Sequence, residues 1–145
     1  MVPEGVTRTA LDYETEERFV SLRRPLEVTS FGLNQITLQP GQRLRIHRHA
    51  SQEEVYLVVR GKLAVLFEGG QELELAEGEL ARVPASVRRQ LVNRFPEPCT
   101  LVAIGAHGPH EGRDGEAFTA WDETEGRPPQ EVPLPSDLPV PGPSA

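Results

Sequence analysis

Two histidines and a glutamate stand close together in the first half of the chain, at His47, His49 and Glu54. Residues two apart in an extended strand point to the same face, so the two imidazoles should project together, about 7 Å apart along the chain. Glu54 opens the next apolar run, where it can fold back beside the histidines. Two neutral imidazoles and one carboxylate suit a divalent transition metal such as Fe, Mn, Ni or Zn. The spacing therefore predicts a metal site in a strand-turn-strand unit.

The elements that must position these side chains are short strands. Between about residues 17 and 105, alternating or β-branched apolar runs are separated by turn residues. A tight hairpin is predicted at Gly69 and Gly70, because glycine adopts a positive φ without a Cβ penalty. Short strands at this spacing are typical of an all-β sandwich or barrel. The predicted strands cover residues 19–24, 33–38, 43–47, 54–59, 63–67, 72–75, 80–83, 87–93 and 99–104.

The pattern around the histidines resembles the first motif of the cupin family. That motif is a glycine, five residues, His-x-His, three or four residues, a glutamate, six residues and a second glycine. Every position is matched, by Gly41, His47, His49, Glu54 and Gly61. The resemblance implies that the two histidines and the glutamate are metal ligands.

The second cupin motif is matched only in part. It is a glycine, five residues, Pro-x-Gly, two residues, a histidine, three residues and an asparagine. Gly78, Pro84 and Asn93 are in register, but Ser86 replaces the glycine of the motif. Arg89 stands where the motif has the histidine that completes the metal site. The resemblance therefore implies a cupin site in which one familiar ligand is replaced by an arginine.

The resemblance also implies an architecture. A small single-domain cupin of the cupin 2 type is a conical β-barrel, also called a jelly roll or double-stranded β-helix, with its ligand site inside and a homodimer as the common assembly. The pattern places the barrel domain at residues 17–105, after an N-terminal extension at 1–16. Residues 106–145 are rich in Gly and Pro, which predicts a C-terminal segment that is partly extended or disordered.

Arg89 conflicts with a bound metal, since the resemblance would point it toward the histidines and Glu54. A guanidinium cannot ligate a metal, and a divalent ion about 4 Å away would repel it by roughly 8 kcal/mol at an effective dielectric near 20. Three arrangements remain open. Without metal, Arg89 pairs with Glu54. With metal, Arg89 swings aside or binds the anionic end of a substrate. In the third, a shifted register turns Gln90 or Arg88 inward.

Other side chains have weaker claims on the site. Tyr56 shares the face of Glu54 by alternation, which predicts that it lines the cavity beside Arg89. His107 and His110 follow the last predicted strand and are candidates for a fourth metal ligand, although they lie in a Gly-Pro loop where a solvated histidine is ordinary.

The strand before His47 contains a conflict. Leu44 and Ile46 have the character of core residues, which would turn Arg43 and Arg45, which alternate with them, outward. Strict alternation then places His47 on the same face as Arg45. Either a bulge precedes His47 or both arginines face the cavity, and the second option favours an anion-binding cavity.

Composition narrows the classes of function. The formal net charge is −7 and the basic residues are scattered, which disfavours binding to nucleic acid. Cys99 is the only cysteine, and the chain shows neither a secretion signal nor an apolar run of membrane-spanning length. We therefore expect a cytoplasmic protein with no membrane partner.

These observations lead to two hypotheses of function. In the first, His47, His49 and Glu54 hold a divalent metal, while Arg89 and Tyr56 contact a small anionic metabolite that the protein binds or transforms. Family members with such sites include dioxygenases, isomerases and lyases. In the second, the barrel is metal-free, Glu54 and Arg89 form a buried pair, and the protein is a non-catalytic ligand-binding or scaffold module.

Overall fold

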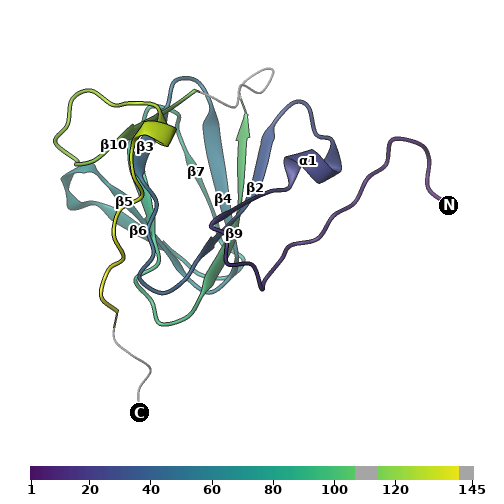
Figure 1. Cartoon of the computed structure of the whole chain (residues 1–145), viewed down its shortest axis with the longest axis horizontal. Coiled ribbons are helices and arrows are strands. Elements are labelled where there is room, and N and C mark those ends of the chain that lie inside the picture. The colour runs from purple at the N-terminus through teal and green to yellow at the C-terminus, as the bar shows by residue number, and fades with distance from the viewer. Residues whose placement is uncertain (107–113, 141–145) are drawn as a thin grey trace, which may run out of the picture.

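Two antiparallel sheets of five strands each face one another across an apolar core in the computed structural model, which describes residues 1–106 and 114–140 (Figure 1). The strand order is β1-β2-β9-β4-β7 in the first sheet and β10-β3-β8-β5-β6 in the second. The predicted all-β jelly-roll architecture is thereby confirmed. The first sheet contains β1 (Phe19–Ser21), β2 (Gly32–Leu38), β4 (Glu53–Arg60), β7 (Leu80–Val83) and β9 (Cys99–Ala106). The second contains β3 (Ile46–His49), β5 (Leu63–Phe67), β6 (Glu72–Leu75), β8 (Arg89–Val92) and β10 (Gly115–Phe118).

The predicted strands are all present, with differences at their ends. The first ends at Ser21, and one helical turn, α1 (Arg23–Leu26), follows where the sequence pattern predicted strand to residue 24. Pro25 lacks the N–H that a strand would donate, and Glu27 ends the turn in the left-handed region, with φ of 59°. The apolar pattern alone did not detect this break.

The hairpin between β5 and β6 is confirmed. Gly69 and Gly70 both have φ of 76°, and they form the 3-10 turn η1 (Glu68–Gly70). A residue with a Cβ would be strained at either position. The turn therefore fixes the register of the two strands at one end of the second sheet.

The core lies between the inward faces of the sheets. Tyr56 and Val58 of β4 are at most 1% exposed, and Leu91 and Leu101 meet them with no exposed surface. Cys99 is also fully buried, and burial raises the pKa of its thiol to about 12. Cys99 is thus a core residue, as the sequence indicated, with no thiolate at neutral pH.

Strand β10 was not predicted, and it extends the second sheet beyond residue 105. It pairs antiparallel with β3, where Gly115 lies opposite His49 and Phe118 opposite Ile46. The segment has only two apolar side chains and begins with glycine, so it carries too little alternation to indicate a strand. Its hydrogen bonds to β3 supply the stability that its own sequence lacks.

Residues 127–138, which we term the C-terminal strap, follow β10 and pack against the second sheet (Figure 1). The backbones of Arg127 and Ala117 exchange hydrogen bonds of 2.8 and 2.9 Å, after which the 3-10 turn η2 (Pro129–Glu131) lies beside β10. Val132 is only 2% exposed. The Pro-rich sequence therefore has a docked position along the barrel as far as Leu138.

Three hydrogen bonds join the strap to the chain before β3. They are Arg45 Nε to Val132 O, Arg43 Nε to Ser136 O (2.8 Å) and Leu138 N to Gly41 O (2.7 Å). Gly41 has φ of 88°, and a Cβ there would overlap the carbonyl oxygen of Leu138. Position 41 therefore requires a glycine, both because of its positive φ and because the strap passes so close to it.

Residues 1–16 form neither strand nor helix. Thr7 Oγ1 donates to Leu26 O, and Asp12 exchanges two hydrogen bonds with the side chain of Gln35, so part of this segment lies against the first sheet. No helix in the described part of the chain is long and apolar enough to cross a membrane.

Candidate metal centre

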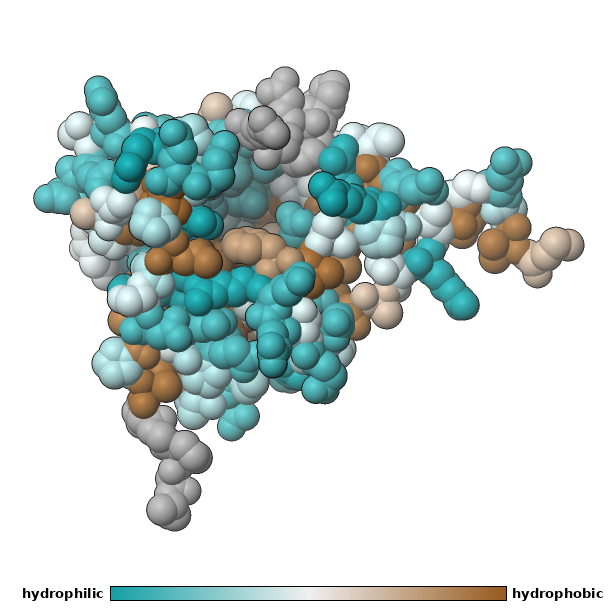
Figure 2. Space-filling view, in the orientation of Figure 1, coloured by the Kyte–Doolittle hydropathy of each residue, from teal (hydrophilic) through white to brown (hydrophobic). Residues whose placement is uncertain are grey.

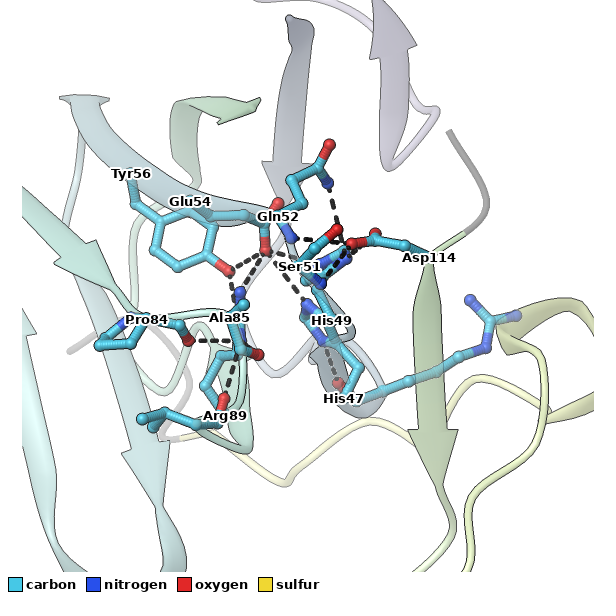
Figure 3. Close-up of polar contacts among 12 residues, drawn as sticks. His47, His49, Ser51, Gln52, Glu54, Tyr56, Pro84, Ala85, Arg89 and Asp114 are labelled. Atoms are coloured by element: carbon cyan, nitrogen blue, oxygen red, sulfur yellow. Dashed lines mark hydrogen bonds and ion pairs between the residues drawn. The ribbon is translucent and has the colours of Figure 1, made fainter. Parts of the chain in front are cut away.

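The two sheets bring the predicted ligands together. His47 and His49 come from β3 of the second sheet, whereas Glu54 comes from β4 of the first, and the three side chains meet between the sheets (Figure 3). One ligand atom from each residue lies within 4.8 Å of the others. The predicted convergence of two histidines and a glutamate is confirmed.

A β-bulge before His47 resolves the conflict in the alternation. Arg43 pairs with Val92 and His47 with Arg89, so four steps along one strand match three along the other. The extra residue lets Leu44 and His47 both line the interior cavity. Ile46 instead lies on the other face of the sheet, under the strap, and is 6% exposed.

One oxygen of Glu54 is the centre of the cluster. Its Oε1 lies 2.9 Å from His49 Nε2 and 3.5 Å from His47 Nε2. The same oxygen accepts hydrogen bonds from Tyr56 OH at 2.8 Å and Arg89 Nη2 at 2.7 Å. Glu54 is therefore held in place from one side by two donors and approached by two imidazoles from the other.

The hydrogen-bond partners of the two Nδ1 atoms determine whether the Nε2 atoms can act as metal ligands. His47 Nδ1 lies 3.0 Å from Arg45 O, and His49 Nδ1 lies 2.7 Å from Asp114 Oδ1. A carbonyl and a carboxylate only accept, so both Nδ1 atoms carry the proton and donate. Each Nε2 atom then either carries a second proton and donates to Glu54, as a charged imidazolium, or presents a lone pair to a cation bound beside Glu54.

The pKa shifts agree with this geometry. Burial would raise the pKa of Glu54, but hydrogen bonds from His47 and His49 hold it well below the ordinary value. Burial also acts against a charged His49, yet the hydrogen bonds and charges of Glu54 and Asp114 raise its pKa. The pocket around Glu54 thus stabilises positive charge, whether a proton or a metal ion supplies it.

Arg89 is buried behind the cluster with no exposed surface. Besides Glu54, its Nε donates to Tyr56 OH at 3.1 Å. Burial acts to lower its pKa, but the interactions with Tyr56 and Glu54 raise it, so the guanidinium is charged. Nη1 donates to the carbonyl oxygens of Val87 (2.7 Å), Ala85 (3.3 Å) and Pro84 (3.4 Å).

The position of Arg89 excludes one of the three arrangements. The register is not shifted, because Arg88 lies over the ring of Phe118 on the other face and Gln90 donates to Leu44 O. Arg89 pairs with Glu54, yet Arg89 does not contact either Nε2 atom, so the pairing does not itself exclude a metal bound by the two histidines. Arg89 does not line the cavity. Its Nε, Nη1 and Nη2 atoms donate to Tyr56, to backbone carbonyls and to Glu54, and its contact with substrate stays a prediction.

A cavity of about 180 Å³ opens beside the cluster. His47, His49, Glu54 and Tyr56 form its polar wall, and the remaining lining is largely apolar. In Figure 2 this face of the molecule is hollowed near its centre, with apolar side chains lining the hollow. The predicted place of Tyr56 on the cavity wall agrees with this geometry. His107 and His110, the alternative ligands, lie outside the described residues.

Comparison with known proteins identifies the family. The model of the cupin domain matches residues 34–105, which include His47, His49, Glu54 and Arg89. The protein belongs to the cupin family. No functionally curated protein matches the sequence.

Solved cupin structures resemble the chain at low sequence identity. A sugar phosphate isomerase of the cupin superfamily from Silicibacter pomeroyi is 27% identical, with a TM-score of 0.60, over 70% of this chain and 65% of that one. A cupin protein from Bacteroides fragilis is 21% identical, with a TM-score of 0.63, over 84% and 98%. The cupin domain of an XRE family transcriptional regulator from Enterobacter cloacae is 19% identical, with a TM-score of 0.55, over 63% and 98%. The chain thus spans less than two thirds of the length of the isomerase.

Asp114 is the residue of this cupin site that the sequence did not indicate. It lies 65 residues after His49, in a Gly-rich segment without a motif. Its Oδ2 accepts hydrogen bonds from the backbone N–H groups of Ser51 (3.1 Å) and Gln52 (2.8 Å). Asp114 therefore fixes both the turn after β3 and the orientation of the His49 ring.

We expect Asp114→Asn to weaken metal binding about 10- to 100-fold, because an amide neither polarises the His49 ring nor enforces its tautomer as a carboxylate does. Competition with a zinc-sensitive dye measures the Kd. Glu116→Gln is the matched control, since Glu116 lies on the neighbouring β10 but contacts Arg48 and Gly126. Equal affinities for the two variants and the wild type would show that Asp114 does not contribute to metal binding.

Proposed function

We propose that this cupin binds a divalent metal through His47 Nε2, His49 Nε2 and Glu54, and a small anionic metabolite in the adjacent cavity. The observation that carries the proposal is the convergence of two imidazole Nε2 atoms on a carboxylate oxygen, with acceptors at both Nδ1 atoms. Residue type suits Fe, Mn, Ni or Zn. A metal bound there would supply Lewis acidity toward a ligand oxygen.

The charges around the site support an anionic ligand. Glu54 and Asp114 each bring one negative charge, and Arg89 brings one positive charge. A divalent ion added to these leaves an excess of one positive charge beside a cavity whose wall is largely apolar. Such an excess is best compensated by a ligand with a carboxylate or phosphate group.

The residues of the chain have separate tasks in this proposal. Arg89 and Tyr56 orient the Glu54 carboxylate from behind, while Arg45 O and Asp114 orient the imidazoles. The apolar cavity wall limits water around the ligand. The site is thereby held in shape without a contribution from the ligand itself.

Among dioxygenase, isomerase and lyase reactions, we favour isomerisation of a small sugar phosphate or related hydroxy anion. The support is the similarity to the Silicibacter pomeroyi structure, which is described as a sugar phosphate isomerase, together with the size of the cavity. Metal-reconstituted protein incubated with a panel of aldose and ketose phosphates should show interconversion by NMR. Activity that persists in His47→Ala, or no conversion of any member of the panel, would exclude this reaction.

The second hypothesis, a metal-free ligand-binding or scaffold module, is supported by the 2.7 Å pair between Arg89 and Glu54. A substitution separates the two hypotheses. We expect Arg89→His to tighten metal binding about tenfold, because it removes a positive charge and adds a third imidazole, as a fourth ligand, opposite His47. Calorimetric titration with Zn(II) measures the affinity. Unchanged or weaker binding in this variant would show that residue 89 does not face the metal site, whereas a wild type that binds no Zn(II) would favour the metal-free module.

A further inference from the structure

Arg45 is a cavity residue without a charged partner. It follows Leu44 at the bulge, lines the cavity together with His47, and also borders a hollow beneath the strap. Within residues 1–106 and 114–140, no carboxylate lies at ion-pair distance from its guanidinium. Arg18, which acts on it electrostatically, is also positive. A positive charge at the cavity wall is thus left uncompensated.

The strap sets the orientation of this guanidinium. Arg45 Nε donates to the carbonyl oxygen of Val132, a residue that is itself buried. With Nε engaged there, the outer edge of the guanidinium keeps N–H groups in a planar pair. That geometry matches the two oxygens of a carboxylate or a phosphate.

The strap also forms part of the cavity wall. Pro129 of η2 lines the cavity, and it packs so closely on β10 that a Cβ at Gly115 would lie 3.2 Å from Pro129 Cγ and 3.8 Å from His49 Cε1. The C-terminal residues therefore reach the edge of the metal centre. A ligand in the cavity would meet the ligands of the metal on one side and the strap with Arg45 on another.

We propose that Arg45, oriented by the strap, binds the oxyanion group of the ligand and so determines specificity for an anionic metabolite. The inference rests on the proposed function, in that it places the same ligand in the same cavity. Binding of an oxyanion to Arg45 does not itself need the metal, because the guanidinium is charged and oriented by protein atoms alone.

The chain offers a matched control in Arg43. Its Nε donates to Ser136 O of the strap at 2.8 Å, as Arg45 does to Val132, but Arg43 does not line the cavity. Loss of Arg43 therefore removes one positive charge and one strap contact without touching the proposed anion site. Arg45→Gln and Arg43→Gln therefore differ mainly in whether the substituted residue lines the cavity.

The experiment is a calorimetric titration of the full chain with inorganic phosphate and, separately, with acetate, at low ionic strength. Wild type, Arg45→Gln, Arg43→Gln and Arg45→Lys are each measured both with Zn(II) and after chelation of metal. We expect Arg45→Gln to weaken binding of the preferred anion about tenfold or more, and Arg43→Gln to change it less than about twofold. The better-bound probe then shows whether the oxyanion is a phosphate or a carboxylate.

Several outcomes would overturn the inference. Equal losses in Arg45→Gln and Arg43→Gln would show that only the strap or the net charge matters, and so would full binding in Arg45→Gln. Binding of neither anion by the wild type at about 10 mM would exclude an anion site. Arg45→Lys keeps the charge but loses the planar fork, so an intermediate affinity is expected even if the glutamine variant folds poorly. The metal proposal is tested separately from this inference. If the protein takes up no Zn(II) but still binds the anion through Arg45, the metal proposal fails and the inference about Arg45 stands.

Discussion

Protein purified without an affinity tag and reconstituted with Fe(II), Mn(II), Ni(II) or Zn(II) should retain close to one equivalent of metal, and His47→Ala should lose it. Removing one of three ligands takes away a direct bond and leaves a water in its place. We expect the affinity to fall by at least about 100-fold, beyond the 10- to 100-fold losses typical of residues that only orient a ligand. Elemental analysis after gel filtration measures the retained metal.

Arg48→Ala is the control for this loss. Arg48 is the residue of β3 between the two histidines, but it faces the opposite side and pairs with Glu116 at 3.1 Å. Its removal disturbs the same strand without reaching the cluster, so the metal content should be unchanged. Wild-type protein that stays metal-free with all four metals would contradict the proposed site and support the metal-free module.

In metal-free protein, Arg89→Met should lower the free energy of unfolding by about 3 to 5 kcal/mol. The substitution removes one partner of a buried ion pair, so that Glu54 keeps its charge in a poorly solvated site, and breaking such a pair typically costs this much. Since domains of this size are stable by only about 5 to 15 kcal/mol, the loss is a large fraction of the whole. Urea unfolding in the presence of a chelator measures it.

The double variant Glu54→Gln with Arg89→Met tests whether the unpaired charge of Glu54 causes the loss of stability. It removes both charges together, so it should recover part of the stability that Arg89→Met loses, and the coupling should appear in a double-mutant cycle. Arg82→Ala is the exposed control. Arg82 pairs with Glu53 at 3.1 Å, with both side chains more than half exposed, and its loss should cost less than about 1 kcal/mol. Equal effects of Arg89→Met and Arg82→Ala would mean that the buried pair contributes no more to the free energy of unfolding than the exposed pair does.

Local patterns in the sequence predicted the first half of the site well. The His-x-His spacing needed only the period of a strand to place two imidazoles on one face, and Glu54 follows after one short turn. The bulge before His47 was one of two readings left open, because alternation shows that a strand is irregular without showing where its extra residue lies. The structure has both the bulge and an arginine on the cavity wall.

The parts of the site that depend on distant segments could not be predicted. Asp114 meets β3 from 65 residues further along the chain, and the strap meets the segment before β3 from up to 97 residues further along, between Gly41 and Leu138. Their sequences resemble those of ordinary Gly- and Pro-rich segments. For Arg89, the pattern indicated an inward side chain near Glu54. It could not indicate that three backbone carbonyls would hold the guanidinium behind the cavity wall, because those contacts arise from the turn before β8.

The late position of β10 in the chain has a consequence for synthesis. In the complete second sheet, β3 lies between β8 and β10, so both of its edges are paired. A ribosome releases β3 and β8 well before residues 115–118, and until then β3 is the open edge of the nascent sheet. Unpaired strand edges are templates for aggregation. At about 5 to 20 residues per second, this exposure lasts only a few seconds in each round of translation. A chain whose translation stalled after β9 would keep that edge open, on the strand that carries both histidines.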